Sequence, residues 1–326
     1  MTSLNTLLQT NPTSLLGHRG ARGERFENSK EGFEFIQNLA THSEGKLVGI
    51  EFDVQLTKDG ELIVFHDEDL TRLFNRQSRI DQLSAEEIQR ICHIPINVSY
   101  KSFEFFNNSQ RSSNSKPELF NQSVQHVYPY KKHSIMLLKH MPKMLQGYSH
   151  IELEVKTHCR TDYAKMVDSL KSCLLDQIFK DLPIILTSFD VALHQHLQHD
   201  VELSLYRRGL LVEPASSNLT EELFKNSLQV CSGIISPNNN TITLNENCLM
   251  STGQAFSNTI SLALRLGCTS IGLFYPIFNE NFIGECHKYG LTTTAWTVNN
   301  VEYAKTLVQL GVDYLITDYP SIFLRS

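Results

Sequence analysis

Residues 49–67 read Gly-Ile-Glu-Phe-Asp-Val-Gln-Leu-Thr-Lys-Asp-Gly-Glu-Leu-Ile-Val-Phe-His-Asp. Apolar and polar residues alternate over 50–55, which is typical of a strand with one apolar and one polar face. Glu51 and Asp53 therefore share a face. At a separation of about 4 Å and an effective dielectric constant of about 20, two carboxylates repel by about 4 kcal/mol. A fold that keeps these acids together needs a compensating positive charge.

A second strand-like run, residues 61–65, ends at His66. Asp59-Gly60 between the runs is typical of a two-residue hairpin turn, which would pair Asp53 with His66. A parallel crossover is the alternative, although it usually needs a dozen or more residues. In both arrangements we expect His66 to lie near the acids.

The acidic face predicts a site for one divalent cation. Carboxylate oxygens are hard ligands that suit Mg²⁺, Ca²⁺ or Mn²⁺. No cysteine occurs in residues 49–67 to favour zinc.

Strand-like runs recur along the rest of the chain, and amphipathic helical stretches separate most of them. The first strand is expected at residues 15–20, and further strands at 150–156, 183–187, 202–206, 234–236, 269–274, 292–298 and 314–318. About eight strand and helix units predict an α/β protein with a TIM (β/α)₈ barrel. In such a barrel the apolar strand faces pack against outer helices, and reactive groups gather at the carboxyl ends of the strands.

Residues 92–134 have a polar centre at 107–116 and little periodicity. We expect a polar surface insertion there, between the third and fourth strands of one domain that spans residues 1–326. A hydrophobic fraction of 41% and a charged fraction of 20% are those of a globular protein. The net charge of -6 gives no indication of a nucleic-acid partner.

The seven cysteines are scattered, and no two are spaced as CxxC. This argues against a disulfide framework and against a thiolate zinc site. Residues 1–14 lack a signal-peptide pattern, and no run of 18 apolar residues occurs in the chain. We expect a cytoplasmic protein without stable membrane insertion.

Eight residues, all but Glu27 in or at the ends of strand-like runs, are candidates for a functional site: His18, Arg19, Glu27, Glu51, Asp53, His66, Glu154 and Lys156. Each alone has an ordinary explanation, such as a hydrogen-bonded structural histidine or a surface ion pair. Together they would be costly to bury without a metal and an anionic ligand. An arginine fork and a lysine suit a phosphate, and two histidines can act as base and acid near neutral pH.

Other polar or aromatic residues have weaker patterns. His194, His196 and His199 favour a solvated helix face over a metal cluster, because residues two apart on a helix do not face each other. Trp296 is interpreted from its pattern as core packing, with a ligand-facing wall as the alternative. Asp318 precedes Tyr319-Pro320 and is interpreted as a turn-forming residue.

The chain resembles the glycerophosphodiester phosphodiesterase family in motifs that follow one another in the family's order over nearly the whole sequence. They are His18-Arg19-Gly20 with Glu27-Asn28 (similar to HRG and PENT), residues 51–67, Glu154-Val155-Lys156 (similar to ExK), residues 296–299, and residues 311–313 with 317–320. Phe26 and Ser29 replace the proline and threonine of PENT, and residues 135–139 lack the acids common in the family. These differences affect residues expected at the rim of the substrate site, and therefore bear on which alcohol group the substrate carries.

The resemblance implies roles for nine residues in a TIM barrel. The metal is held by Glu51, Asp53 and Glu154, and His18 and His66 are acid and base. The phosphate is bound by Arg19 and Lys156, while Trp296 lines the substrate pocket and Glu27 supports the site from behind.

The implied function is metal-dependent hydrolysis of a small-molecule glycerophosphodiester to glycerol 3-phosphate and an alcohol. One alternative is a phospholipase D-like hydrolase that acts on lysophospholipids. A second alternative is a catalytically silent barrel that binds phosphodiesters.

Overall fold

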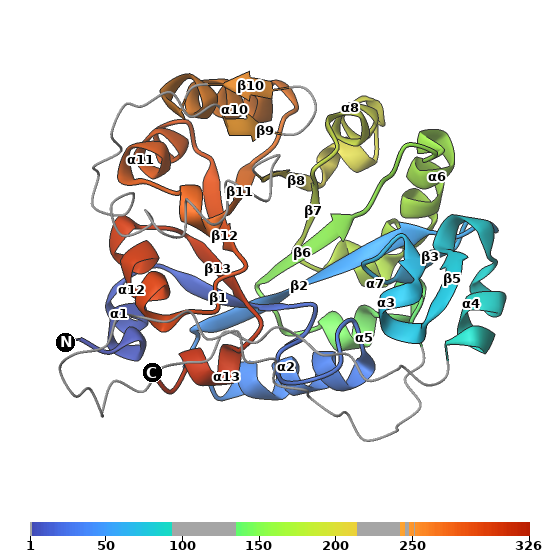
Figure 1. The fold of residues 1–326 in the computed structure, drawn as a ribbon, viewed down its shortest axis with the longest axis horizontal. Coiled ribbons are helices and arrows are strands. Elements are labelled where there is room, and N and C mark those ends of the chain that lie inside the picture. Colours follow the sequence, from blue (N-terminus) through green and yellow to red (C-terminus); the bar gives the residue numbers. More distant parts are fainter. Residues whose placement is uncertain (1, 93–134, 214–241, 245–247, 251) are drawn as a thin grey trace.

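The computed structural model describes residues 2–92, 135–213, 242–244, 248–250 and 252–326. Eight parallel strands form a closed barrel, because β1 pairs with β2 on one side and with β13 on the other (Figure 1). The predicted TIM barrel is confirmed. The barrel strands are β1 (Ser14–His18), β2 (Leu47–Leu56), β6 (His150–Val155), β7 (Ile184–Ser188), β8 (Arg207–Val212), β11 (Ser270–Phe274), β12 (Thr292–Trp296) and β13 (Tyr314–Thr317).

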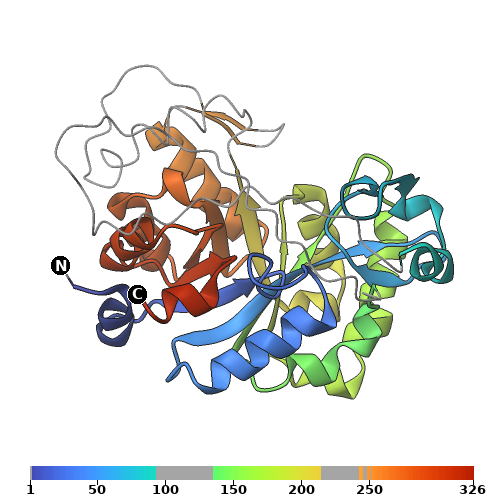
Figure 2. The same ribbon diagram turned by 60° about the horizontal axis from the view of Figure 1, so that its bottom comes forward.

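Helices surround the strands, and Figure 2 shows the same arrangement with α2 brought forward. The helices are α1 (Leu4–Thr10), α2 (Lys30–Thr41), α5 (Pro142–Leu145), α6 (Tyr163–Leu174), α7 (Gln177–Lys180), α8 (Val191–His199), α10 (Thr252–Arg265), α11 (Glu280–Lys288), α12 (Val301–Leu310) and α13 (Pro320–Phe323). A short antiparallel pair, β9 (Ile242–Leu244) and β10 (Cys248–Met250), precedes α10. No helix among the described residues is long and apolar enough to cross a membrane.

The two faces of the barrel strands separate as the alternation predicts. Ile50, Phe52 and Val54 of β2 belong to the main apolar cluster, together with helical residues such as Phe33 of α2. The alternate residues Glu51 and Asp53 are buried but belong to neither apolar cluster. The acids therefore point toward the barrel axis while the apolar face of the strand packs on helices.

The hairpin after β2 is confirmed, but its predicted register is wrong by one residue. β3 (Leu62–Val64) runs antiparallel to β2 with Val54 opposite Val64, whereas a two-residue turn requires Phe65 there. The chain reverses over residues 57–61 because the Thr57 hydroxyl accepts from the Glu61 amide at 3.0 Å and donates to Asp59 at 2.6 Å. His66 consequently lies beyond the paired segment and not opposite Asp53.

A small unit follows the hairpin and has an apolar cluster of its own, which includes Ile63, Phe65 and Phe74. Its elements are β4 (Asp69–Leu70), α3 (Thr71–Phe74), β5 (Arg76–Arg79), the 3₁₀ turn η1 (Ile80–Gln82) and α4 (Ala85–Ile91), and η2 (Leu138–His140) closes the segment. Ser84 and Glu87 form a capping box at the start of α4. Counted in barrel strands, the expected insertion at 92–134 follows the second strand, and residues 93–134 lie outside the described part of the chain.

The prediction of one strand is wrong, and the prediction of another concerns residues that the structure does not describe. Residues 203–205 form the 3₁₀ turn η3 (Leu203–Leu205), and the strand begins at Arg207 instead. The Asp200 carboxylate accepts from the Glu202 and Leu203 amides at 3.0 and 2.9 Å, which holds a tight turn where an extended strand was expected. The strand expected at 234–236 lies outside the described residues.

Because β2 and β6 lie very close together at Gly49, we expect Gly49→Ala to destabilise the protein. A Cβ at Gly49 would lie 1.7 Å from the carbonyl oxygen of His150, so the two strands would have to separate. We expect a loss of about 3 kcal/mol in the free energy of unfolding, measured by urea titration. Gly284→Ala is the matched control, because a Cβ there meets nothing within 4 Å and alanine favours the α11 helix by about 1 kcal/mol. Equal stability of the two variants would contradict the close packing.

Candidate active site

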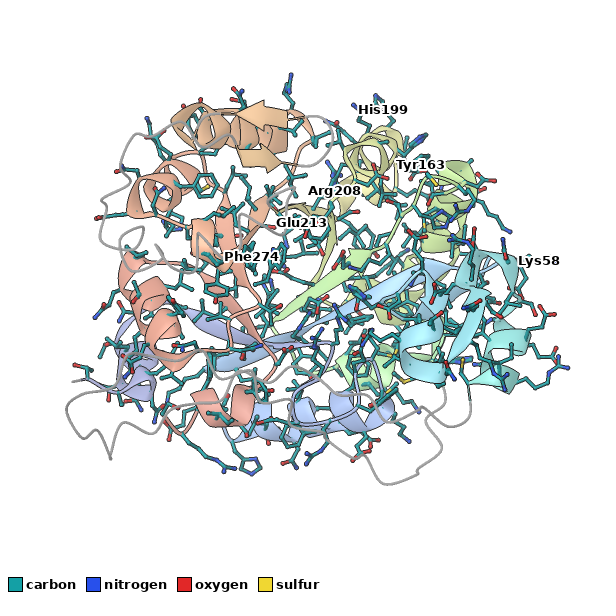
Figure 3. The ribbon with its side chains drawn as sticks, viewed as in Figure 1. Lys58, Tyr163, His199, Arg208, Glu213 and Phe274 are labelled. Atoms are coloured by element: carbon teal, nitrogen blue, oxygen red, sulfur yellow. The ribbon has the colours of Figure 1, made fainter. Side chains whose placement is uncertain are left out.

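A cavity of about 1020 Å³ opens at the carboxyl ends of the barrel strands. It is lined by seven of the nine residues predicted for the site, namely His18, Arg19, Glu51, His66, Glu154, Lys156 and Trp296. Tyr163 of α6 and Glu213, directly after β8, also line it and are labelled in Figure 3. The structure thus brings together side chains from both ends of the sequence.

Three buried carboxylates form one cluster at the wall of this cavity. Each of Glu51, Asp53 and Glu154 offers an oxygen, and these oxygens all lie within 4.8 Å of one another. Asp53 of β2 is the direct neighbour of Glu154 on β6 in the parallel register. Among the described residues, no other group of histidine, cysteine and acid side chains is arranged to hold a metal.

The electrostatics of the cluster fit a divalent cation. Burial and the charges of Asp53 and Glu154 raise the pKa of Glu51 well above its usual range. Burial also raises the pKa of Glu154 to about 7, although Lys156 opposes the shift. The pKa of Asp53 is well below its usual range despite burial, because Arg19 and Lys156 stabilise its charge.

Asp53 Oδ1 is buried and makes no hydrogen bond within the described part of the chain, although Lys156 Nζ lies 3.3 Å away. Two cations face three carboxylates, so one negative charge has no balancing cation among these five groups. Oxygen donors of this kind suit Mg²⁺, Ca²⁺ or Mn²⁺. The residues therefore fit a divalent ion held by Glu51, Asp53 and Glu154.

His18 ends β1 and is oriented by Asp318. Its Nδ1 lies 2.6 Å from Asp318 Oδ1, and its Nε2 lies 3.7 Å from Glu51 Oε2. Burial lowers the pKa of His18 to about 4, although Asp318 opposes the shift. Since charges and hydrogen bonds keep the pKa of Asp318 low despite its burial, the carboxylate accepts the bond and the His18 Nδ1 carries the hydrogen. Nε2 is left as the acceptor on the side of the acids.

His66 follows β3 and has the same type of partner. Its Nδ1 lies 2.6 Å from Asp67 Oδ1, and burial lowers its pKa. Gln55 of β2 donates to the carbonyl oxygens of Phe65 and Asp67 at 3.0 and 2.6 Å, which ties this segment to the barrel. Two histidines, each held by an aspartate, therefore line the same cavity.

The two predicted phosphate-binding cations touch the acids. Arg19 Nε lies 3.2 Å from Asp53 Oδ2, and its Nη1 donates to Glu27 Oε1 at 3.1 Å. Lys156 Nζ lies 2.5 Å from Glu154 Oε1. Glu27 is buried behind Arg19 and does not line the cavity, in keeping with its expected supporting position.

Trp296 ends β12 and lines the cavity, so the interpretation as pure core packing is wrong. Its ring packs edge-on against Phe189 with centroids 5.5 Å apart. The sequence pattern could not separate the two interpretations, because an inward-pointing residue at the end of a strand can contact both the apolar core and the cavity. Its indole Nε1 has no hydrogen-bond partner among the residues that the structure describes.

The remaining histidines of the sequence pattern do not form a site. His194 is fully buried and its Nε2 donates to the Ser188 carbonyl oxygen at 3.1 Å, so its assignment to a solvated face is wrong. His196 and His199 are exposed on α8, as expected. The burial of His194 follows from its position one turn after Asp190, where α8 packs on β7.

Pattern reasoning missed three partners of the site residues. Asp318 is a buried partner of His18 and not merely a turn residue, and Asn299 donates to its Oδ2 at 2.8 Å. Asn28 precedes Ser29, the N-cap of α2, and donates to Asp53 Oδ2 at 2.9 Å. The position of Asp318 at the carboxyl end of a barrel strand was a usable signal.

The acid cluster predicts direct binding of a divalent ion. Titration calorimetry with Mn²⁺ should show one site per chain, and Asp53→Asn should weaken it at least 10-fold because a carboxylate ligand is lost. Glu152→Gln is the matched control: Glu152 is a buried acid beside Glu51, but it accepts from the Thr294 hydroxyl at 2.7 Å. Equal affinities of wild type and Asp53→Asn would refute the ligand set.

The fold described above agrees with the results of comparisons with known proteins. Residues 18–322 match the model of the glycerophosphoryl diester phosphodiesterase family. A glycerophosphodiester phosphodiesterase of Caldanaerobacter subterraneus is 23% identical over 96% of this chain and 97% of its own length. A human lysophospholipase D is 21% identical over 94% of this chain and 83% of its own. The fold is similar to that of an Oleispira antarctica phosphodiesterase, solved in complex with its product sn-glycerol-3-phosphate, at a TM-score of 0.61 and 17% identity over 98% of this chain and 99% of that one. The chain belongs to the glycerophosphodiester phosphodiesterase family.

Proposed function

We propose that this protein hydrolyses glycerophosphodiesters to glycerol 3-phosphate and an alcohol. The observation that carries the proposal is a single cavity lined by acids of the metal cluster, two aspartate-held histidines and two cations. A phosphodiester needs these three kinds of group, for charge stabilisation, proton transfer and binding of its anionic oxygens.

The cations and the histidines would have different roles in the reaction. Arg19 and Lys156 bind the non-bridging oxygens of the phosphate, for which a fork of donors and a point charge are suited. Glu51, Asp53 and Glu154 would hold a divalent ion, which when bound would supply Lewis-acid polarisation of a phosphoryl oxygen. One histidine takes the proton of the attacking oxygen, and the other protonates the leaving alkoxide. Burial lowers the pKa of both rings, which favours the neutral form that the base needs, and the histidine that acts as acid has to gain a proton before it can protonate the alkoxide.

Hydrolysis of lysophospholipids is a second candidate, supported by the apolar wall of the cavity. Phe189, Leu210, Leu211, Val212 and Leu262 line it on the side of β7, β8 and α10. An acyl chain requires such a surface, and one full-length relative bears the name lysophospholipase D. A turnover panel of glycerophosphocholine, glycerophosphoethanolamine, glycerophosphoglycerol, glycerophosphoinositol and lysophosphatidylcholine separates the two candidates.

Removal of the ion should abolish activity. We expect EDTA to stop the release of glycerol 3-phosphate from the best glycerophosphodiester of the panel, and added Mg²⁺ or Ca²⁺ to restore it, because the cluster then regains its balancing charge. A coupled assay for glycerol 3-phosphate measures both steps. Turnover that persists in EDTA would remove the metal from the proposal, and no turnover under any condition would favour a barrel that only binds phosphodiesters.

Loss of either histidine should slow the chemical step. We expect His66→Ala and His18→Ala each to lower kcat by about 10²-fold to 10⁴-fold, because a positioned acid or base is removed. His199→Ala is the control, since His199 lies exposed on α8, away from the cavity lining (Figure 3). The measurement is steady-state kinetics on variants whose thermal unfolding is unchanged. An unchanged kcat in His66→Ala would refute the role of His66 as acid or base.

A further inference from the structure

Arg72 joins two carboxylates that lie behind the cavity. It comes from α3 in the small unit after the hairpin and does not line the cavity. Its Nε and Nη2 donate to Asp67 at 2.6 and 3.1 Å, and its Nη1 and Nη2 donate to Glu27 at 2.7 and 2.6 Å. One guanidinium therefore makes four charge-assisted hydrogen bonds, two to each partner.

Each of the two carboxylates holds a different residue of the cavity. Asp67 is the hydrogen-bond partner of His66 Nδ1. Glu27 accepts from Arg19 Nη1, and Arg19 in turn lies against Asp53. A continuous chain of contacts thus runs from His66 through Arg72 to the acid cluster.

We propose that Arg72 is a positioning residue that holds His66, through Asp67, and Arg19, through Glu27, in the geometry that phosphodiester hydrolysis requires. The inference deepens the proposed function and rests on it. Arg72 would act only through these carboxylates and not on the substrate.

The shape of the guanidinium explains why an arginine stands there. The same Nη2 contacts Glu27 Oε1 and Asp67 Oδ1, so removal of Arg72 leaves two carboxylates facing each other without a cation between them. Like charges then move apart, and His66 and Arg19 move with them. A lysine offers a single ammonium and cannot reproduce two bidentate contacts in one plane.

The test compares three arginine substitutions with wild type, and adds Asp67→Asn alone and in combination with Arg72→Ala. Arg72→Ala removes the contacts, and Arg72→Lys keeps the charge in case the alanine variant fails to fold. Arg79→Ala is the matched control, because Arg79 of β5 also pairs with two acids of the same unit, Glu68 and Asp81, and has no contact with the cavity. Thermal unfolding of all variants is measured beside the kinetics.

We expect Arg72→Ala to lower kcat by about 10²-fold, as for a catalytic group displaced by roughly 1 Å, and Arg72→Lys by at least 10-fold. Arg79→Ala should stay within twofold of wild type. The double variant of Arg72→Ala with Asp67→Asn should lose less than the product of the two single losses, because both changes break the same contact chain. If Arg72 had a purely structural effect, the losses in kcat of the two single variants would multiply in the double variant.

A spectroscopic measurement keeps the inference separate from the proposed function. In the wild-type protein, proton NMR should show a strongly hydrogen-bonded ring N–H signal for His66, identified by its absence in His66→Ala. This signal should persist in Arg79→Ala and disappear or shift in both Arg72 variants. If wild type hydrolyses no diester, the proposed function fails while this signal still tests the positioning. An unchanged signal, a kcat within threefold of wild type in Arg72→Ala, or multiplying losses would overturn the inference.

Discussion

The parallel pairing of β2 with β6 is the constraint on which the rest of the site depends. It sets Glu51 beside Glu152 and Asp53 beside Glu154 inside the barrel, where like charges repel strongly. The protein places two cations among the acids, with Arg19 following β1 and Lys156 following β6. Because the compensation comes from neighbouring strands, the closed barrel and the charged cluster stabilise each other.

Three of the groups that face the cavity are each held by a partner that does not line it. His18 has Asp318, His66 has Asp67, and Arg19 has Glu27. Side chains bound in this way lose little freedom when a ligand arrives, which is the physical meaning of preorganisation. The small unit between β3 and α4 contributes to this order, because its own apolar cluster fixes the segment that carries His66.

The sequence by itself determined the barrel, the direction of the acid-bearing faces and seven of the residues that line the cavity. Alternation with a period of two is a local property of a strand, so residues 50–55 revealed which side chains point inward before any partner strand was known. The rule that reactive groups gather at strand carboxyl ends then placed His18 and Glu154 on one side of the barrel, whereas the pocket position of Trp296 was implied only by the family resemblance. The family resemblance, carried by motifs in order, supplied their expected roles.

Only the tertiary structure decided the partners of these residues. Asp318 meets His18 from 300 positions away, and Arg72 meets Glu27 from 45, at distances along the chain where no local period applies. The hairpin register was decided by side-chain bonds of Thr57 and Asp59 that compete with the simplest turn. Trp296 and His194 show the same limit, because burial depends on what packs against a residue. Local pattern specifies direction along an element, whereas contact requires the whole chain to be folded.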